Sequence, residues 1–183
     1  MATRKGLVVV YTGDGKGKTS AALGAAMRAL GHGWKVLIIQ FFKGDWPVLY
    51  GELELAKKLH PQFEVLQLGR GFVKIMGDKK PFSEHLDAAK AALEITRERM
   101  RSGQYDMIIL DESIYALGYM DFRLIELADV LQLIKEKPPQ MHLVFTGRNA
   151  PPELIEAADL VTEMREVKHP MKKGIPAQQG LDY

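Results

Sequence analysis

The stretch that decides the fold is Leu7-Val-Val-Val-Tyr-Thr-Gly-Asp-Gly-Lys-Gly-Lys-Thr-Ser20. It begins with an apolar run typical of a buried strand, continues into a turn with closely spaced glycines, and leads into an alanine-rich segment typical of a helix. A glycine-rich turn between a strand and a helix gathers free backbone N–H groups at the positive end of the helix, which is where phosphate groups bind. The stretch therefore predicts a phosphate-binding loop in an α/β protein.

The residue types in this turn suit a nucleoside triphosphate. Gly13, Gly15 and Gly17 permit unusual backbone dihedral angles and the close approach of a ligand. Lys18 supplies a mobile positive charge, and the hydroxyl group of Thr19 can bind Mg²⁺. We expect the triphosphate to be bound by the loop residues Gly13, Asp14, Gly15, Lys16, Gly17, Lys18, Thr19 and Ser20.

Three residues in and near the loop leave alternatives open. The strict pattern G-x-x-x-x-G-K-[ST] has glycine at the position of Thr12, so the loop is a variant of the Walker A motif. Lys16 either faces the ligand or neutralises Asp14. Arg28, on the helix that follows the loop, either reaches the nucleotide, contacts a second subunit or faces solvent.

Further apolar runs of strand length recur along the chain, with helical stretches between them. Their near-continuous hydrophobic character is typical of parallel strands that helices cover on both faces, and the third run, which partly alternates, is expected nearer an edge. We predict one domain over residues 1–183 with the three-layer, mainly parallel α/β fold of RecA-like P-loop NTPases, ending in a solvated tail at residues 168–183. The expected strands are Leu7 to Tyr11, Val36 to Phe42, Phe63 to Leu68, Met107 to Leu110, Met141 to Phe145 and Leu160 to Arg165.

The expected helices follow from periodicity and from end signals. The first should place one apolar stripe on the sheet, and the second, from Glu84 to about Arg101, has Ser83 as a candidate N-cap. Two more are expected, from about Arg123 to Lys137 and from Pro151 to about Ala158. The stripe of the first helix consists of Ala22, Leu23, Ala26, Met27 and Leu30.

Composition excludes several classes of function. The chain has 183 residues with 25 Lys and Arg against 23 Asp and Glu, a balance that argues against a nucleic-acid partner. The absence of cysteine excludes a disulfide scaffold, a thiolate metal site and a cysteine nucleophile. The start of the chain lacks a secretory core and no apolar run is long enough for a membrane span, so we expect a cytoplasmic protein without a membrane partner.

A pair of carboxylates supports the nucleotide site. Asp111 and Glu112 follow the apolar run Met107-Ile-Ile-Leu110, which would place them at the carboxyl edge of a central strand, beside the phosphate loop. The two side chains point in different directions if the strand persists, so one should bind Mg²⁺ directly while the other acts through water or orients the first. Thr19, Glu112 and Asp111 are therefore the candidate metal residues.

A nucleotide site does not name a reaction, and three readings remain open. In an ATPase or kinase, Glu112 would activate water or a hydroxyl group for attack on the γ-phosphorus. In a second class, the triphosphate is a leaving group and the attack falls on carbon 5′ of the ribose. The third reading is a nucleotide-gated binding module.

Segments along nearly the whole chain carry a resemblance to one family. They are Thr12-Gly-Asp-Gly-Lys-Gly-Lys-Thr19, Gly31-His-Gly33, Gln40-Phe-Phe-Lys-Gly-Asp-Trp-Pro47, Leu110-Asp-Glu112, Thr146-Gly-Arg148, Val167-Lys-His169 and Ala177-Gln-Gln-Gly-Leu-Asp-Tyr183. Together they resemble the ATP:corrinoid adenosyltransferases of the CobA/CobO/BtuR type, and the third and last segments are much more specific than the loop. The resemblance implies transfer of the 5′-deoxyadenosyl group of ATP to the cobalt of a Co(I) corrinoid with release of triphosphate, in cobalamin synthesis or salvage. A small RecA-like ATPase with Glu112 as base is the alternative.

The resemblance also implies roles and partners. It makes Lys18, Thr19 and Glu112 the catalytic set around MgATP, with ATP held in the reverse sense to that of ordinary P-loop enzymes. Because Co(I) is itself a strong nucleophile, the protein needs no nucleophilic side chain and no general base, and its task is alignment, charge stabilisation and exclusion of water. A homodimer and a reduced flavin or flavodoxin electron donor are likewise implied.

The corrin side is implied by a shorter pattern. The family has Gly-Phe-Thr-Trp where this chain has Gly71-Phe72-Val73-Lys74, so Phe72 matches and Lys74 replaces a tryptophan. Trp46 and Phe42 either line the corrinoid site or fill the core, and Arg148 is expected to meet phosphate or a corrin side chain.

Overall fold

The computed structural model describes residues 4–45, 49–74, 77–118 and 122–183. Its centre is a six-stranded sheet in the order β3-β2-β4-β5-β1-β6, and every strand pair is parallel. The predicted α/β fold is therefore confirmed, including the edge position of the third strand. The strands are β1 (Val8–Thr12), β2 (Val36–Gln40), β3 (Phe63–Gln67), β4 (Met107–Asp111), β5 (His142–Thr146) and β6 (Leu160–Glu163).

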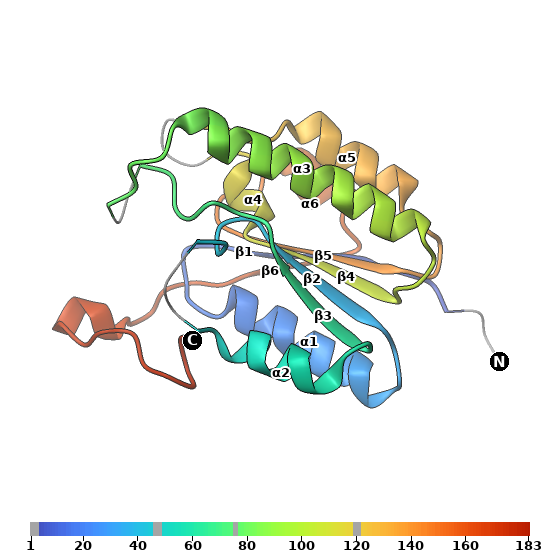
Figure 1. Cartoon of the computed structure of the whole chain (residues 1–183), viewed down its shortest axis with the longest axis horizontal. Coiled ribbons are helices and arrows are strands. Elements are labelled where there is room, and N and C mark those ends of the chain that lie inside the picture. Colours follow the sequence, from blue (N-terminus) through green and yellow to red (C-terminus); the bar gives the residue numbers. More distant parts are fainter. Residues whose placement is uncertain (1–3, 46–48, 75–76, 119–121) are drawn as a thin grey trace.

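Helices cover both faces of the sheet (Figure 1). Helices α1 (Lys18–Gly31) and α2 (Gly51–Leu59) lie on one face. The other face carries α3 (Phe82–Arg101), α4 (Ser113–Ala116), α5 (Leu127–Glu136) and α6 (Pro152–Ala157). A 3₁₀ turn at Pro170–Lys173 lies in the C-terminal tail.

The central strands are hydrophobic throughout because each contributes alternate residues to two cores. Along β2, Val36 and Ile38 pack toward α1, whereas Leu37 and Ile39 belong to the core on the opposite face. All four side chains are at most 2% exposed. Burial of both faces explains why the sequence shows continuous apolar runs instead of alternation.

Helices α2 and α4 were not among the predicted helices, and three further details differ from the sequence predictions. Met27, expected to face the sheet, is 70% exposed, because the buried stripe of α1 is a narrow row of alanines that lies close to the strands. Helix α3 begins at Phe82 with Pro81 as its N-cap, so Ser83 lies inside the first turn and does not cap. Helix α5 begins at Leu127, after backbone bonds from residues 124 and 125 to the Ala116 carbonyl that hold the preceding segment out of a helix.

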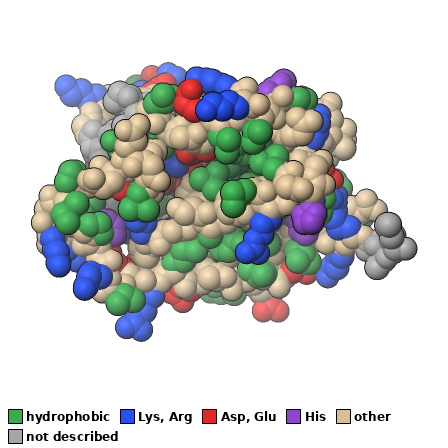
Figure 2. All heavy atoms as spheres, turned by 90° about the horizontal axis from the view of Figure 1, so that it is seen from below, with side chains coloured by type: hydrophobic (Ala, Val, Ile, Leu, Met, Phe, Trp, Pro, Cys, Tyr) green, Lys and Arg blue, Asp and Glu red, His purple; other side chains and the backbone are tan. Residues whose placement is uncertain are grey.

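The outer face of α1 and α2 carries apolar side chains among charged ones (Figure 2). Besides Met27, the side chains of Leu55 and Leu59 on α2 are 45% and 37% exposed. In the described part of the chain, no helix combines the length and the apolar character that crossing a bilayer requires.

The topology brings four chain segments to the carboxyl edge of the sheet. The phosphate loop follows β1, and the segments after β2, β4 and β5 end at the same edge because all strands run in parallel. Open parallel sheets bind ligands at this edge.

Candidate active site

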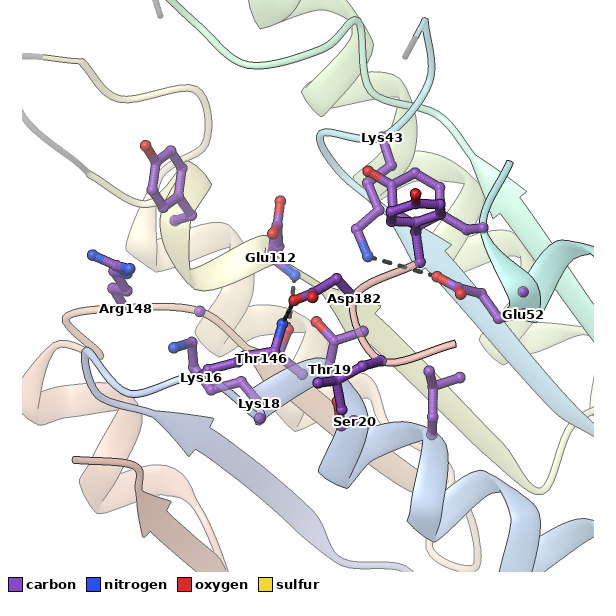
Figure 3. Close-up of a pocket in the computed structure, with 18 of the residues that line it drawn as sticks. Lys16, Lys18, Thr19, Ser20, Lys43, Glu52, Glu112, Thr146, Arg148 and Asp182 are labelled. Atoms are coloured by element: carbon purple, nitrogen blue, oxygen red, sulfur yellow. Dashed lines mark hydrogen bonds and ion pairs between the residues drawn. The ribbon is translucent and has the colours of Figure 1, made fainter. Parts of the chain in front are cut away.

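A cavity of about 800 Å³ opens at the carboxyl edge of the sheet (Figure 3). Its walls come from the phosphate loop and the start of α1, from residues after β2, from the start of α2, from α4, and from the loop after β5. The end of the C-terminal tail forms a further wall. Segments distant in sequence therefore share one cavity.

Glycine is required in the phosphate loop by the backbone geometry. Gly13 and Gly17 have φ values of 93° and 118°, a region that side chains disfavour. A Cβ atom on Gly13 would come within 2.4 Å of the Met164 carbonyl oxygen, and the amide of Gly15 donates a hydrogen bond of 2.7 Å to that same oxygen. The loop is thus packed against the chain just after β6.

Thr12 occupies the position at which the strict Walker A motif has glycine. It is the last residue of β1 and is buried. Its hydroxyl oxygen accepts a 3.1 Å hydrogen bond from the Ala150 amide, so the side chain joins the loop after β5 to the sheet.

Lys18 lies folded over the loop. Its Nζ atom donates hydrogen bonds of 2.7 Å to the carbonyl oxygens of Gly13 and Gly15. Burial and the nearby Arg148 guanidinium lower the pKa of Lys18, while Asp14 and Glu112 act in the opposite direction. Two cations close enough to repel each other favour a bound anion.

Asp111 is the hub of the polar network. Its Oδ1 atom accepts hydrogen bonds of 2.8 Å from the hydroxyl groups of Thr19 and Thr146. Its Oδ2 atom lies 3.2 Å from Lys43 Nζ and accepts a 3.4 Å hydrogen bond from Gln40. With both oxygens engaged, Asp111 orients the residues around it.

Glu112 has a different environment. It adopts a left-handed conformation with φ of 61° directly after β4, where it is the N-cap residue of α4. Its Oε2 atom is buried and has no hydrogen-bond partner among the described residues. Burial, followed by the charge of Asp111, raises the pKa of Glu112 to about 7.

These oxygens suit a hard cation such as Mg²⁺. The Glu112 Oε2 atom is a carboxylate oxygen without a hydrogen-bond partner among the described residues, so it could bind a metal ion. The Thr19 hydroxyl donates its proton to Asp111, which leaves its lone pairs free for a metal ion. The predicted metal residues are therefore together, with Asp111 in the orienting position.

Lys43 is a site residue that the sequence predictions missed. Its side chain is 10% exposed and lies 3.2 Å from Asp111 and 3.6 Å from Glu52, with its Nζ atom 4.6 Å from the centre of the Tyr50 ring. Burial alone would lower the pKa of Lys43, but the carboxylates of Asp111, Glu112 and Glu52 outweigh it and raise the pKa. Lys43, Tyr50 and Glu52 all line the cavity. The available signal was the family-like segment Gln40 to Pro47, which contains Lys43.

The predicted corrinoid residues occupy different places. Phe72 lines the cavity, while Phe42 is 1% exposed and stacks behind Phe72 at a ring distance of 6.2 Å, so Phe42 supports the wall from the core. Phe42 also meets the edge of Tyr115, another cavity residue, at 5.0 Å. Trp46 lies outside the described residues. Lys74 is absent from the lining and its Nζ atom lies 5.7 Å from the centre of the Phe82 ring.

Of the two arginines predicted at the site, only one lines the cavity. Arg148 lines the cavity, 3.9 Å from Asp14. Arg28 lies in the last turn of α1, at the end opposite to the loop, and is not among the lining residues.

The C-terminal tail differs in part from the prediction of a solvated segment. It is exposed along most of its length, but residues 180–183 line the cavity and Asp182 forms an ion pair with Lys16. Lys16 therefore points to an acid other than Asp14. The family-like ending Ala177 to Tyr183 was the signal for this contact, but sequence spacing could not place it.

The parallel sheet, the loop after β1 and the acidic pair at the end of β4 define a nucleotide-binding protein of the P-loop class. In agreement, the fold is similar to the crystal structure of the flagellar accessory protein FlaH from Methanocaldococcus jannaschii. The TM-score is 0.56 at 13% sequence identity, covering 87% of this chain and 71% of that one.

Sequence comparison narrows the class to a family. The family model described as ATP:corrinoid adenosyltransferase BtuR/CobO/CobP matches residues 4–183. A corrinoid adenosyltransferase from a Sinorhizobium species is 42% identical over 100% of this chain and 84% of its own length. The corrinoid adenosyltransferase of Escherichia coli K12 is 37% identical over 98% of this chain and 86% of its own length. The chain belongs to the ATP:corrinoid adenosyltransferase family and is a transferase that adenosylates corrinoids with ATP.

Proposed function

We propose that the cavity at the carboxyl edge is where the 5′-deoxyadenosyl group of ATP passes to the cobalt of a Co(I) corrinoid. The observation that carries this proposal is that Lys18, Thr19, Glu112 and Phe72 line the same cavity. The loop offers amides and ammonium groups to a triphosphate, and the aromatic wall offers an apolar surface to a macrocycle.

The transfer requires one bond to form and one to break. The electron pair of Co(I) attacks carbon 5′ and forms the cobalt–carbon bond, and the carbon–oxygen bond to the α-phosphate breaks. The bonding electrons leave on the triphosphate, so no proton acceptor is needed. The chain contributes by fixing the distance between the reactants and by stabilising the negative charge of the leaving group. Lys18 and the loop amides have this second role.

Mg²⁺ would be held by the Thr19 hydroxyl and the Glu112 carboxylate, with Asp111 orienting Thr19 through its 2.8 Å hydrogen bond. Bound there, the ion neutralises part of the charge on the triphosphate. Gly13 to Ser20 form the ATP-binding segment in this proposal.

For the corrinoid, Phe72 forms a wall that Phe42 stiffens from behind, and an aromatic wall supplies no ligand to cobalt. Arg148 lies on the loop side of the cavity and is assigned to an anionic group. Trp46 stays a candidate for the corrinoid site on sequence alone.

The wider setting is also proposed. Apolar side chains on the outer face of α1 and α2 support a homodimer (Figure 2). Met27 on α1 and Leu55 and Leu59 on α2 are exposed, and Arg28 on α1 would then contact the second subunit instead of the nucleotide. A cytoplasmic location and a reduced flavin or flavodoxin electron donor follow from the family. We assign no nucleic-acid or membrane partner.

Product analysis tests the proposal. The protein is incubated with MgATP, with and without chemically reduced cobalamin, and the expected products are triphosphate and light-sensitive adenosylcobalamin in the complete mixture alone. Steady release of ADP without corrinoid would instead support the ATPase with Glu112 as base, which the comparisons do not favour. Lys18→Ala should abolish the product in either case and serves as the inactive control.

A further inference from the structure

The end of the C-terminal tail folds into a tight turn that holds a carboxylate in the cavity. The amide of Gln178 donates a 2.7 Å hydrogen bond to Asp182 Oδ2, and the amide of Asp182 donates one of 2.8 Å to the Gln178 carbonyl. The other carboxylate oxygen, Oδ1, pairs with Lys16 Nζ, and the Asp182 side chain is 18% exposed (Figure 3). The turn therefore presents a preoriented anion to the phosphate loop.

This carboxylate and a bound triphosphate would compete for one cation. Lys16 lies between Gly15 and Gly17, within the loop to which the triphosphate is assigned. Lys16, Thr19 and Asp182 line the same cavity. A carboxylate that stayed on Lys16 would lie against the negatively charged phosphates, and like charges repel strongly where water is partly excluded.

We propose, on the basis of the proposed function, that Asp182 is a positioning residue that competes with the triphosphate for Lys16. ATP displaces the Asp182 carboxylate from Lys16, and the return of the carboxylate promotes release of the triphosphate product. Because Asp182 is part of the chain, its effective concentration at the loop is high and independent of the protein concentration. A partly exposed ion pair is weak, so triphosphate can still displace it.

Calorimetric titration of the full chain tests the competition, with MgATP and with inorganic triphosphate plus Mg²⁺ as probes. Asp182→Asn keeps the shape and a hydrogen-bond acceptor for Gln178 but removes the charge, and it should tighten both affinities roughly two- to fivefold. Asp182→Glu should stay close to the wild type. Glu156→Gln removes the same charge from an exposed position on α6 and should change nothing. Equal or weaker binding by Asp182→Asn overturns the proposal.

A double-mutant cycle locates the effect at Lys16. In a Lys16→Ala background, Asp182→Asn should no longer alter the affinity for triphosphate, because the shared cation is gone. A gain that persists in this background would mean that Asp182 acts elsewhere, and the proposal would be wrong.

Amide hydrogen exchange follows the tail directly. Adding Mg²⁺ and triphosphate should speed exchange at residues 178–182 in the wild type, since displacement of the carboxylate loosens the turn. Slower exchange would show that the tail closes on the ligand, which contradicts competition. The proposed function and the competition by Asp182 are refuted by different results. The proposed function fails if the wild type binds neither probe, or if Lys18→Ala binds them as well as the wild type does. If those controls behave as expected and Asp182→Asn is unchanged, the competition alone fails.

Discussion

Replacing Lys43 with methionine tests how the buried polar network is stabilised. The change keeps the apolar stem and removes the ammonium group that lies 3.2 Å from Asp111 and 3.6 Å from Glu52. Their side chains are 1% and 8% exposed, and the buried Glu112 lies nearby. Three carboxylates would then share the region without their central cation.

The size of the effect follows from burial. Removing one partner of a buried ion pair costs about 3–5 kcal/mol, because the remaining charge is left uncompensated. For a chain of this length the loss corresponds to a fall in melting temperature of about 6–20 °C. Lys43→Arg keeps the charge and should recover much of the loss.

Urea denaturation followed by circular dichroism measures the difference in free energy of unfolding. Lys5→Met is a matched control, since Lys5 pairs with Asp159 at 3.2 Å but its side chain is 77% exposed, and its loss should cost at most about 1 kcal/mol. If Lys43→Met lies within 1 kcal/mol of the wild type, the carboxylates do not depend on Lys43 and our account of the network is wrong.

Three further predictions concern the wall, the loop and the response to acid. Phe72→Ala should lower the rate of adenosylation at least tenfold with little change in the affinity for MgATP. Phe82→Ala, at an exposed position of α3, should change neither the rate nor the affinity. An equal loss of rate and affinity in Phe72→Ala would refute the assignment of Phe72 to the corrinoid wall. Gly13→Ala should abolish ATP binding because its Cβ atom would meet the Met164 carbonyl at 2.4 Å, whereas Gly24→Ala, with nothing within 4 Å, should be tolerated; binding assays on both decide. Although burial opposes it, hydrogen bonds from the Lys35 amide and from Arg4 lower the pKa of Asp106, so its stabilisation is present at neutral pH and lost as the pH falls below about 4. Asp106→Asn should therefore be about 1 kcal/mol less stable at pH 7 and equal to the wild type in acid; a constant difference across that range would exclude ionisation as the cause.

Local sequence signals predicted the parts of the site that lie in one segment. The phosphate loop requires a strand, glycines and a helix in succession, and all of these lie within residues 7–31. Asp111 and Glu112 were found for the same reason, because a buried strand ends at them. Chemistry that depends on neighbours along the chain is readable from residue order.

The missed residues depend on contacts between distant segments. Lys43 contributes to the site because α2 places Glu52 beside it. The parallel register of β2 and β4 also sets Gln40 opposite Asp111, close to Lys43. The contact of Lys16 with Asp182 spans 166 residues. Neither contact leaves a periodic signal, so sequence pattern alone could not supply the pairing. The wrong prediction that Met27 faces the sheet has another cause. A helix rich in alanine buries a narrower stripe than the positions of its apolar residues suggest.

The distribution of charge in the cavity bears on how one fold can favour alkyl transfer over hydrolysis. Lys16, Lys18 and Arg148 bring positive charge to the cavity lining, and Phe72 adds an apolar surface to the same lining. Hydrolysis would need a base that removes a proton from a water molecule attacking phosphorus. The unpartnered Glu112 oxygen is instead assigned, together with the Thr19 hydroxyl, to a metal ion. Carbon 5′ bound between the cationic region and the apolar wall would meet a nucleophile that carries its own electron pair and needs no proton removed. The arrangement therefore favours breaking the bond between carbon and the α-phosphate oxygen.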